Sequence, residues 1–372
     1  MKNLLVTGGA GFIGSNFVHY WLQRYPDDKI VVVDALTYAG NRDNLSALAD
    51  NDRLRFEHAD INDTELMQEL LRTQSIDTIV HFAAESHVDR SIEGPDAFIT
   101  ANILGTHSLL KAARQVWLIE GAGQGKDGTA CRFHHVSTDE VYGSLSSDEP
   151  AFAETKAYAP NSPYSASKAA SDFLVRAYHH TYGMNVTTSN CSNNYGPYHF
   201  PEKLIPLVIL NILRGKSLPI YGDGKNIRDW LYVEDHAYGI DLVISKGKAG
   251  ETYNIGGCNE WTNIDIVKLV CQLMDERFKT DGKLASRFPE CPAAQAQASD
   301  SLIEFVSDRA GHDFRYAIDA TYSEEQLGYK PKTTFEEGIE RTIDWYLANE
   351  DWWTSVLDGS YHAWIETNYK AS

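Results

Sequence analysis

The chain has 372 residues, and 33 lysines and arginines against 52 aspartates and glutamates give it a formal net charge of −19. So acidic a surface repels phosphate, which argues against a nucleic acid polymer or an anionic membrane as the main partner. A hydrophobic fraction of 43% with 23% charged residues excludes a disordered or fibrous chain. No apolar run reaches the ~18 residues of a membrane helix.

The first residues and the cysteines predict a cytoplasmic protein. Met1 leads almost at once into an apolar run and a glycine cluster, which leaves no room for a signal peptide. The five cysteines are widely spaced and form no Cys-x-x-Cys pair. This usage is typical of a reduced chain without a disulfide framework or a zinc site, so no metal is expected.

Short β-branched runs alternate with helical patterns in the first half of the chain. Strands are expected at 4–7, 30–34, 54–58, 78–82, 133–137 and 186–190, and helices at 12–25, 64–72, 97–117 and 163–182. Apolar strands separated by helices are typical of parallel strands buried on both faces. We therefore predict an α/β fold with a Rossmann-type doubly wound parallel sheet.

The alternation stops near residue 190. Helices are expected at 204–213, 233–245, 263–278 and 335–348, with short strands near 219–221 and 252–255. This pattern predicts a smaller, mixed α+β lobe over residues 191–372, after a first lobe over residues 1–190. No flexible linker separates the two, so segments can interleave across this border. Two stretches, 121–128 and 289–301, are expected to be surface loops, the second of them mobile.

A glycine-rich motif follows the first expected strand. Residues 9–14 fit G-x-G-x-x-G, and Gly8 gives a second series of glycines at 8, 11 and 14. Asp34 ends the next strand about 20 residues later. Free N–H groups at the start of the following helix favour a pyrophosphate. Asp34 can accept hydrogen bonds from both ribose hydroxyls and would repel a 2′-phosphate, so the motif predicts NAD rather than NADP. The alternative is a glycine-rich turn in a protein without this ligand.

Two further strand ends are candidates for the cofactor site. Asp60 and Ile61 follow the third strand and could hold an adenine, although Asp60 could equally cap the helix expected from residue 63. Ala83 and Ala84 are small residues after the fourth strand. They would allow a close approach of the cofactor, or they could reflect tight packing.

A tyrosine and a lysine at helical spacing predict redox chemistry. Ser162 can cap a helix that has Pro163 in its first turn, and Tyr164 and Lys168 then share one face. A nearby ammonium lowers the pKa of a tyrosine, so its phenolate can take a proton from a substrate hydroxyl as hydride leaves the carbon. With the dinucleotide motif and Thr138, this set resembles the extended short-chain dehydrogenase/reductases that act on nucleotide sugars.

Two adjacent acids distinguish this chain within that family. Asp139 and Glu140 follow Thr138 at the end of the fifth strand, in the sequence STDEVYG. A carboxyl pair can split its roles when the environment separates the two pKa values, and elimination of water next to a ketone needs both an acid and a base. The alternative is that the two acids are solvated loop charges.

Longer motifs narrow the resemblance to the nucleotide-sugar 4,6-dehydratases of this family. They are FAAESHVDRS at 82–91, STDEVYG at 137–143, NCSNNYGPYHFPEK at 190–203, PIYG at 219–222, RDWLYVED at 228–235 and DRAGHD at 308–313. The resemblance implies conversion of dTDP-glucose to dTDP-4-keto-6-deoxyglucose and water. It also implies a homodimer packed through helices near 104–117 and 165–182.

The resemblance assigns the chemical roles. Tyr164, with Lys168 and Thr138, takes the proton of the C4 hydroxyl while NAD takes the C4 hydride. Glu140 then takes the C5 proton and Asp139 protonates the departing C6 hydroxyl, after which the hydride returns to C6. The spacing of the two acids by itself does not order them as acid and base.

The resemblance also implies binding residues. Those expected at the cofactor are Gly8, Gly11, Phe12, Ile13, Gly14, Asp34, Ala35, Leu36, Thr37, Asp60, Ile61, Phe82, Ala83, Ala84, Glu85, Ser86, Tyr164, Lys168 and Asn194. Those expected at the nucleotide sugar are Ser86, Thr138, Asn193, Lys203, Leu204, Pro219, Ile220, Tyr221, Arg228, Asn263, Asp308, Arg309, Ala310, Gly311 and His312.

Three departures from the family pattern and three competing interpretations accompany these assignments. Ala310 replaces a proline, Ala101 replaces a threonine near the cofactor, and residues 279–303 form a longer segment than usual. A C4 epimerase or a decarboxylase of the same fold would lack a use for the acid pair. A catalytically silent NAD-binding protein would keep the glycines but would have no need for Tyr164 and Lys168.

Overall fold

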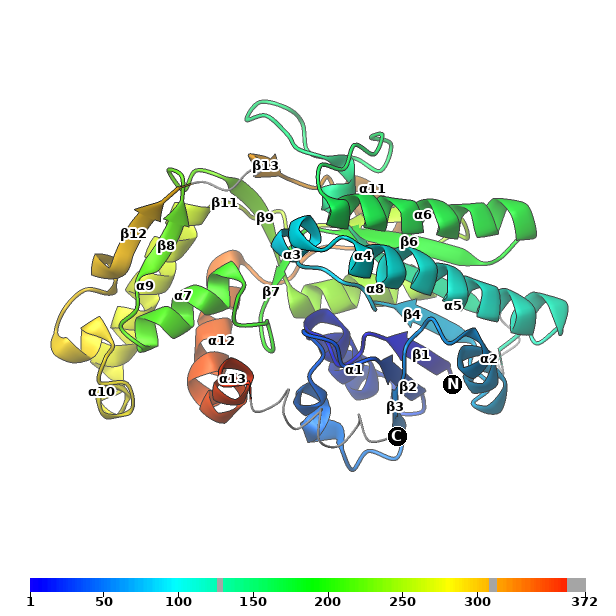
Figure 1. The fold of residues 1–372 in the computed structure, drawn as a ribbon, viewed down its shortest axis with the longest axis horizontal. Coiled ribbons are helices and arrows are strands. Elements are labelled where there is room, and N and C mark those ends of the chain that lie inside the picture. The colour runs from blue at the N-terminus through cyan, green and yellow to red at the C-terminus, as the bar shows by residue number, and fades with distance from the viewer. Residues whose placement is uncertain (126–129, 308–312, 360–372) are drawn as a thin grey trace.

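The computed structural model describes residues 1–125, 130–307 and 313–359 (Figure 1). Seven parallel strands form its main sheet, in the order β10-β6-β5-β4-β1-β2-β3. The strands are β1 (Asn3–Thr7), β2 (Lys29–Asp34), β3 (Leu54–His58), β4 (Thr78–His81), β5 (Arg132–Thr138), β6 (Val186–Cys191) and β10 (Thr252–Ile255). The predicted Rossmann-type sheet is confirmed.

Helices cover both faces of this sheet because its strands are apolar on both sides. Leu4 and Val6 of β1 pack with α1 (Phe12–Arg24) and α8 (Val233–Lys246). Leu5, between them, points to the other face and packs with α2 (Thr64–Thr73), α5 (Thr106–Ala113) and α6 (Pro163–Tyr182). Figure 1 shows α5 and α6 side by side along that face. The result is a three-layer arrangement.

The helix expected at 97–117 is a continuous helical run of four pieces. These are α4 (Asp96–Phe98), a π-helical stretch (Ile99–Gly105), α5 and a second π-helical stretch (Arg114–Ile119). A short helix, α3 (Val88–Glu93), precedes the run, and a 3₁₀ segment (Arg42–Leu48) follows β2. Neither was expected from the sequence, because both are short and depend on tertiary contacts.

The second lobe mixes small sheets and helices, as predicted. Strand β9 (Ile227–Tyr232) pairs with β7 (Asn193–Tyr195), β11 (Glu260–Thr262) and β13 (Arg315–Tyr316), while β8 (Leu218–Tyr221) pairs with β12 (Ile303–Val306). The helices are α7 (Leu204–Leu213), α9 (Asn263–Thr280), α10 (Leu284–Arg287), α11 (Thr321–Leu327), α12 (Phe335–Ala348) and α13 (Glu350–Leu357). Helices α7, α9 and α12 enclose one apolar core.

Segments from beyond residue 190 join the main sheet. Strand β10 pairs in parallel with β6, from Thr252 opposite Thr188 to Ile255 opposite Cys191. Helix α8 packs against α1 on the same side of the sheet. We therefore propose a division in which residues 1–192 and 233–255 form the first lobe and the other residues form the second.

The stretch 289–301, expected to be a mobile surface loop, contains short turns and buried residues that its low complexity did not predict. It forms two 3₁₀ turns, Pro292–Gln295 and Ser299–Leu302, and Cys291 is fully buried in the core of the second lobe. Ser299 Oγ donates a hydrogen bond of 2.6 Å to Asp275 on α9. Residues 126–128 of the other expected loop lie outside the described residues. Across the described ranges, no helix combines the length and the apolar character needed to cross a membrane.

Candidate active site

A cavity of about 860 Å³ lies where the first and second lobes meet, at the carboxyl ends of the parallel strands. In the sheet, β2 and β3 follow β1 on one side, and β4, β5 and β6 follow one another on its other side. The direction in which successive strands are added therefore changes between β1 and β4, and these two strands flank this switch point. Ligands of such sheets bind outside the carboxyl ends of the strands at this point. Gly8, after β1, and Phe82, after β4, both line the cavity.

The glycine motif makes the close turn from β1 into α1. Gly8 has φ of +69°, and a Cβ there would lie 2.6 Å from the backbone N of Ala83. A Cβ on Gly14 would lie 2.2 Å from the carbonyl oxygen of Gly8, whereas one on Gly11 would meet only that oxygen, at 3.3 Å. Helix α1 begins without a side-chain cap and without an acid in its first turn. These features leave room and backbone N–H groups for a pyrophosphate.

Asp34 lies at the end of β2 and faces the cavity while its carboxylate is held by backbone amides. The N–H groups of Ala10 and Leu36 each donate to it at 2.9 Å. Burial raises the pKa of Asp34, and the two backbone hydrogen bonds oppose that shift. A carboxylate fixed here suits ribose hydroxyls and opposes a 2′-phosphate, so the residues present fit NAD.

Most of the expected cofactor residues line this cavity, and one does not. Leu36 packs its side chain with Ala10 and Phe56, so only its N–H group supports the site, through Asp34. The expected residues that do line the cavity are Gly8, Gly11, Phe12, Ile13, Gly14, Asp34, Ala35, Thr37, Asp60, Ile61, Phe82, Ala83, Ala84, Glu85, Ser86, Tyr164, Lys168 and Asn194.

Asp60 and Asn194 illustrate how these side chains are held. The cap of α2 is Asp63, which accepts from the N–H of Leu66, whereas Asp60 accepts from Asn62 beside the cavity. The alternative that Asp60 caps this helix is therefore wrong. Asn194 Nδ2 donates to the carbonyl of Ser192, and its Oδ1 lies 2.9 Å from Nδ1 of His236.

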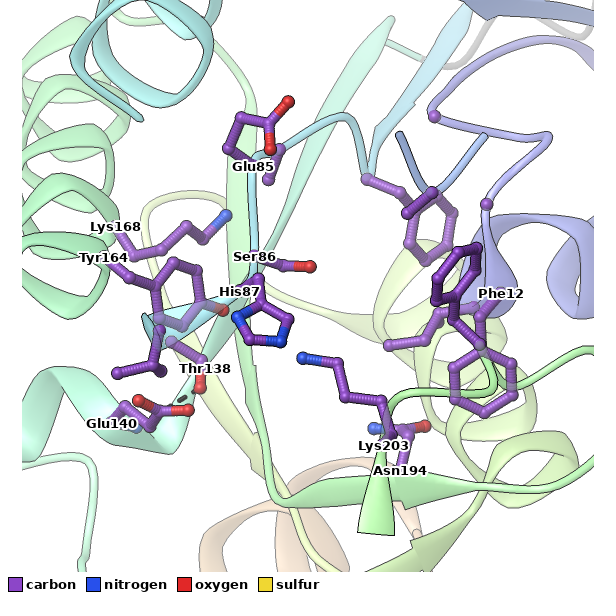
Figure 2. A pocket seen from close by; sticks show the side chains of 18 of the residues that line it. Phe12, Glu85, Ser86, His87, Thr138, Glu140, Tyr164, Lys168, Asn194 and Lys203 are labelled. Atoms are coloured by element: carbon purple, nitrogen blue, oxygen red, sulfur yellow. Dashed lines mark hydrogen bonds between the residues drawn. The ribbon is translucent and has the colours of Figure 1, made fainter. Parts of the chain in front are cut away.

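The expected catalytic pair lies at the start of α6. A capping box between Ser162 and Ser165, with Pro163 in the first turn, fixes where this helix begins. Lys168 Nζ donates 2.9 Å to the carbonyl of Val136 on β5. Tyr164 and Lys168 are both almost fully buried, and Figure 2 shows them side by side at the pocket wall.

The environment of Tyr164 works against its ionisation. Burial raises the pKa of Tyr164 well above its ordinary value, and the negative charge of Glu140 adds to the shift. A hydrogen bond with Thr138 lowers that pKa. Burial lowers the pKa of Lys168. A phenolate at Tyr164 therefore depends on positive charge and hydrogen-bond donors close to its oxygen.

The two acids occupy a 3₁₀ turn (Asp139–Tyr142) directly after β5. Asp139 is 2% exposed, and burial, followed by the charge of Glu140, raises its pKa well above the ordinary value. Its Oδ1 accepts from Thr138 at 3.3 Å and its Oδ2 has no hydrogen-bond partner. The backbone N–H of Glu140 donates to Thr138, the dashed line in Figure 2. This environment therefore favours the protonated form of Asp139.

The second lobe contributes the opposite wall of the cavity. Figure 2 shows the side chain of Lys203 pointing toward the side that carries Tyr164 and Glu140. The expected substrate residues that line the cavity are Ser86, Thr138, Asn193, Lys203, Leu204, Pro219, Ile220, Tyr221, Arg228 and Asn263. Asp308, Arg309, Ala310, Gly311 and His312 lie outside the described residues.

Arg228 is buried and held by backbone carbonyls. Its guanidinium donates to the carbonyl oxygens of Ile227, Asp313 and Phe314, at 2.7 Å, 2.9 Å and 3.2 Å. It also stacks over the ring of Tyr316, with 4.4 Å from Cζ to the centroid. A guanidinium held in this way presents a fixed charge to the cavity, where a phosphate is the matching group.

Several lining residues were not assigned from the sequence. Glu202 and Trp230 lie within two of the motifs named above, so that signal could have found them. Asp313 ends a third motif. Tyr38 and Tyr316 carry no motif signal, and the fold brings them to the cavity from the loop after β2 and from β13 itself.

A dinucleotide loop and a Tyr–Lys pair on one cavity are the features of a short-chain dehydrogenase/reductase site. A model of the family described as GDP-mannose 4,6 dehydratase matches residues 5–342, and this chain belongs to that family. The dTDP-glucose 4,6-dehydratase of Shigella flexneri is 53% identical to it over 375 residues, which cover 99% of both chains.

Solved structures with the same fold include a dehydratase and an epimerase. A dTDP-glucose 4,6-dehydratase from Streptomyces venezuelae with NAD bound has a TM-score of 0.81 at 46% identity, covering 95% of this chain and all of that one. The UDP-glucose 4-epimerase of Thermotoga maritima, with UDP-glucose, has a TM-score of 0.77 at 27% identity, covering 94% of this chain and all of that one. The fold is therefore shared with an epimerase as well as with dehydratases.

Proposed function

We propose that this chain is an NAD-dependent hydro-lyase that converts dTDP-glucose to dTDP-4-keto-6-deoxyglucose and water. The observation that carries the proposal is a buried Asp139 beside Glu140, on the same cavity as Tyr164 and the dinucleotide loop. Relatives and structures named dTDP-glucose 4,6-dehydratase, 43–54% identical over nearly the whole chain, support it. An epimerase needs the tyrosine and the cofactor but has no step for a second acid.

Oxidation at C4 is the first step of the proposed reaction. Tyr164 takes the proton of the C4 hydroxyl, with Thr138 and Lys168 stabilising negative charge on its oxygen. Bound NAD supplies an acceptor for the C4 hydride and later a donor to C6. Asp34 and the glycine loop orient it, and the ketone formed at C4 acidifies the C5–H bond.

Elimination follows with the two acids in different roles. Glu140 takes the C5 proton, and Asp139 gives its proton to the C6 oxygen as the C6–O bond breaks, which releases water. After hydride reaches C6, Glu140 returns the proton to C5. Tyr164 has then gained one proton and Asp139 has lost one, so a proton transfer between them restores the site.

A substrate panel tests the proposal. Purified protein is incubated separately with dTDP-, UDP- and GDP-glucose and with the corresponding hexuronic acids, and the products are separated by chromatography and followed by mass. We expect dTDP-glucose to lose the mass of one water without net formation of NADH. Isomerisation at unchanged mass would instead favour the C4 epimerase, and loss of carbon dioxide from the corresponding hexuronic acid would favour the decarboxylase.

We also propose that the chain forms a homodimer through the face made by the π-helical run before α5 and by α6. Leu104 is 52% exposed and Phe173 is 57% exposed on this face, and Ile99 and Tyr182 are exposed as well. Large apolar side chains gathered on one face are typical of a protein interface. The interface of such a dimer would be isologous, because the same helices of both copies would form it.

Phe173→Glu is expected to convert the dimer to a monomer in sedimentation or light-scattering measurements, because it places a charge in an apolar interface. Phe305→Glu is the matched control, since Phe305 is 59% exposed on β12 in the other lobe. Its mass in solution should equal that of the unmodified protein. A monomeric unmodified protein, or equal dissociation by both changes, would contradict the proposed interface.

A further inference from the structure

A buried carboxylate lies behind the catalytic pair and takes no part in the reaction described above. Asp172 is on α6, one helical turn after Lys168, so the two side chains share one face of the helix. It is 5% exposed and does not line the cavity. Asp172 therefore cannot touch substrate or cofactor, and any effect on the reaction has to pass through its neighbours.

The contacts of Asp172 join α6 to the strand that carries the acid pair. Ser137 Oγ donates 2.9 Å to its Oδ2, and the hydroxyl of Tyr158 donates 3.0 Å to the same oxygen. His135 Nε2 lies 3.1 Å from Oδ1. Ser137 and His135 are on β5, the strand that ends at Thr138. Asp172 is thus held in one position by donors that come from outside its own helix.

Lys168 needs a counter-charge in this environment. It is 4% exposed, and the hydrogen bond of its ammonium runs to the neutral carbonyl of Val136. Burial lowers the pKa of Lys168, and the charge of Asp172 is the largest effect that opposes this shift. A buried charge without a partner is costly, so an ammonium at Lys168 depends on a nearby anion.

We propose that Asp172 is a positioning residue that keeps Lys168 protonated, and that it thereby controls the oxidation at C4. The proposal rests on the proposed function, because it concerns the first step of that reaction. Without the carboxylate, the buried lysine loses its proton more readily. Tyr164 then forms its phenolate only at higher pH, and the first step slows.

The groups that face Asp172 from the elements packed around it determine its charge. They are Lys168 on α6, His135 and Ser137 on β5, Tyr158 in the segment before α6, and Tyr142 after β5. Burial raises the pKa of Asp172 to about 6, against the opposing effect of Lys168, Ser137 and Tyr158. Burial holds the pKa of His135 well below its ordinary value, so that ring is neutral.

These charges give the proposal a characteristic pH dependence. Above about pH 6 Asp172 is mostly ionised and supports the lysine, and below that value it is protonated and the support is lost. Asp172→Asn keeps the shape of the side chain and an oxygen that can accept from Ser137 and Tyr158. The variant removes only the charge, so it should differ from the unmodified protein at high pH and resemble it at low pH.

The experiment measures the first step by rapid mixing of the NAD-loaded protein with dTDP-glucose, from pH 5 to pH 9. We expect Asp172→Asn to be about tenfold or more slower above pH 7, with the gap narrowing below pH 6, because loss of an opposite charge shifts a pKa by about 1–3 units. The substrate KM should stay within about twofold, since Asp172 does not line the cavity. A rate ratio that does not change with pH, or an effect on KM alone, would overturn the proposal.

Two further variants test whether the pH dependence comes from Asp172. Tyr158→Phe removes one donor to Asp172, so the pH at which activity falls on the acid side should rise while the carboxylate remains. Asp241→Asn is the matched control, a buried acid that accepts from Tyr20 and Tyr25 away from the cavity, and it should leave the pH profile unchanged.

An infrared measurement tests the proposal for Asp172 without relying on enzyme activity. In the unmodified protein, a carboxylic acid band should disappear with a midpoint near pH 6, and Asp172→Asn should lack this component. An unmodified protein that leaves dTDP-glucose unchanged would overturn the proposed function instead. If it reacts but no such band titrates, the proposal for Asp172 is wrong while the proposed function stands.

Discussion

Asp139→Asn is expected to leave oxidation at C4 in place and to slow the release of water by about 10²- to 10⁴-fold, the usual contribution of a general acid. The amide keeps the size of the side chain but cannot give a proton to the C6 oxygen. Rapid mixing with dTDP-glucose should show reduced nicotinamide forming at nearly the normal rate and then persisting. Product analysis by mass should show little loss of water over the same time.

The pH dependence of the unmodified protein provides the control for this prediction. Burial and Glu140 raise the pKa of Asp139, so its proton is present below that pKa and is lost as the pH rises through it. The elimination rate should therefore fall at high pH in the unmodified protein, and Asp139→Asn should lack this limb. Equal loss of oxidation and elimination in the variant would contradict the division of roles between the acids.

Tyr164→Phe is expected to abolish both steps, because no other group is placed to take the C4 proton in our mechanism. The loss in turnover should be about 10³-fold or more, and no reduced nicotinamide should appear after mixing with substrate. Bound NAD should remain, since Asp34 and the glycine loop are unchanged. Absorbance and the nucleotide content of the purified variant measure the two effects separately.

Tyr142→Phe is the matched control for loss of a buried hydroxyl. The hydroxyl of Tyr142 donates 3.0 Å to Asn254 and does not line the cavity. This variant should lose about 1 kcal/mol of stability and keep the first step. A Tyr164→Phe protein that still reduces its nicotinamide would show that another group is the base.

Much of the fold could be predicted because its signals are local. Continuous apolar runs such as Val31–Val33 predicted strands buried on both faces, and they lie in the main sheet. Strand β10 was assigned to the second lobe because four residues, Thr252–Ile255, carry no sign of the sheet they join. Its pairing with β6 is a contact between distant segments, and such contacts leave no periodic pattern in the sequence.

The residues of the site also divide into those that local spacing predicts and those that only the fold brings together. Tyr164 and Lys168 could be paired from their spacing, since residues four apart on a helix meet. The hydrogen bonds that Ser137 and Tyr158 donate to Asp172 carried no signal, because these partners come from other elements. Low complexity at 289–301 likewise did not reveal that Cys291 enters a core.

The sequence by itself determined the class of chemistry, through the glycine spacing, Asp34, the Tyr–Lys pair and the adjacent acids Asp139 and Glu140. It could not determine which acid is buried, since neighbouring residues differ in environment only once the chain is folded. The tertiary structure placed Asp139 at 2% exposure and gathered its surroundings from both lobes. Burial and nearby charge set a pKa, and both are properties of three-dimensional neighbours rather than of spacing along the chain.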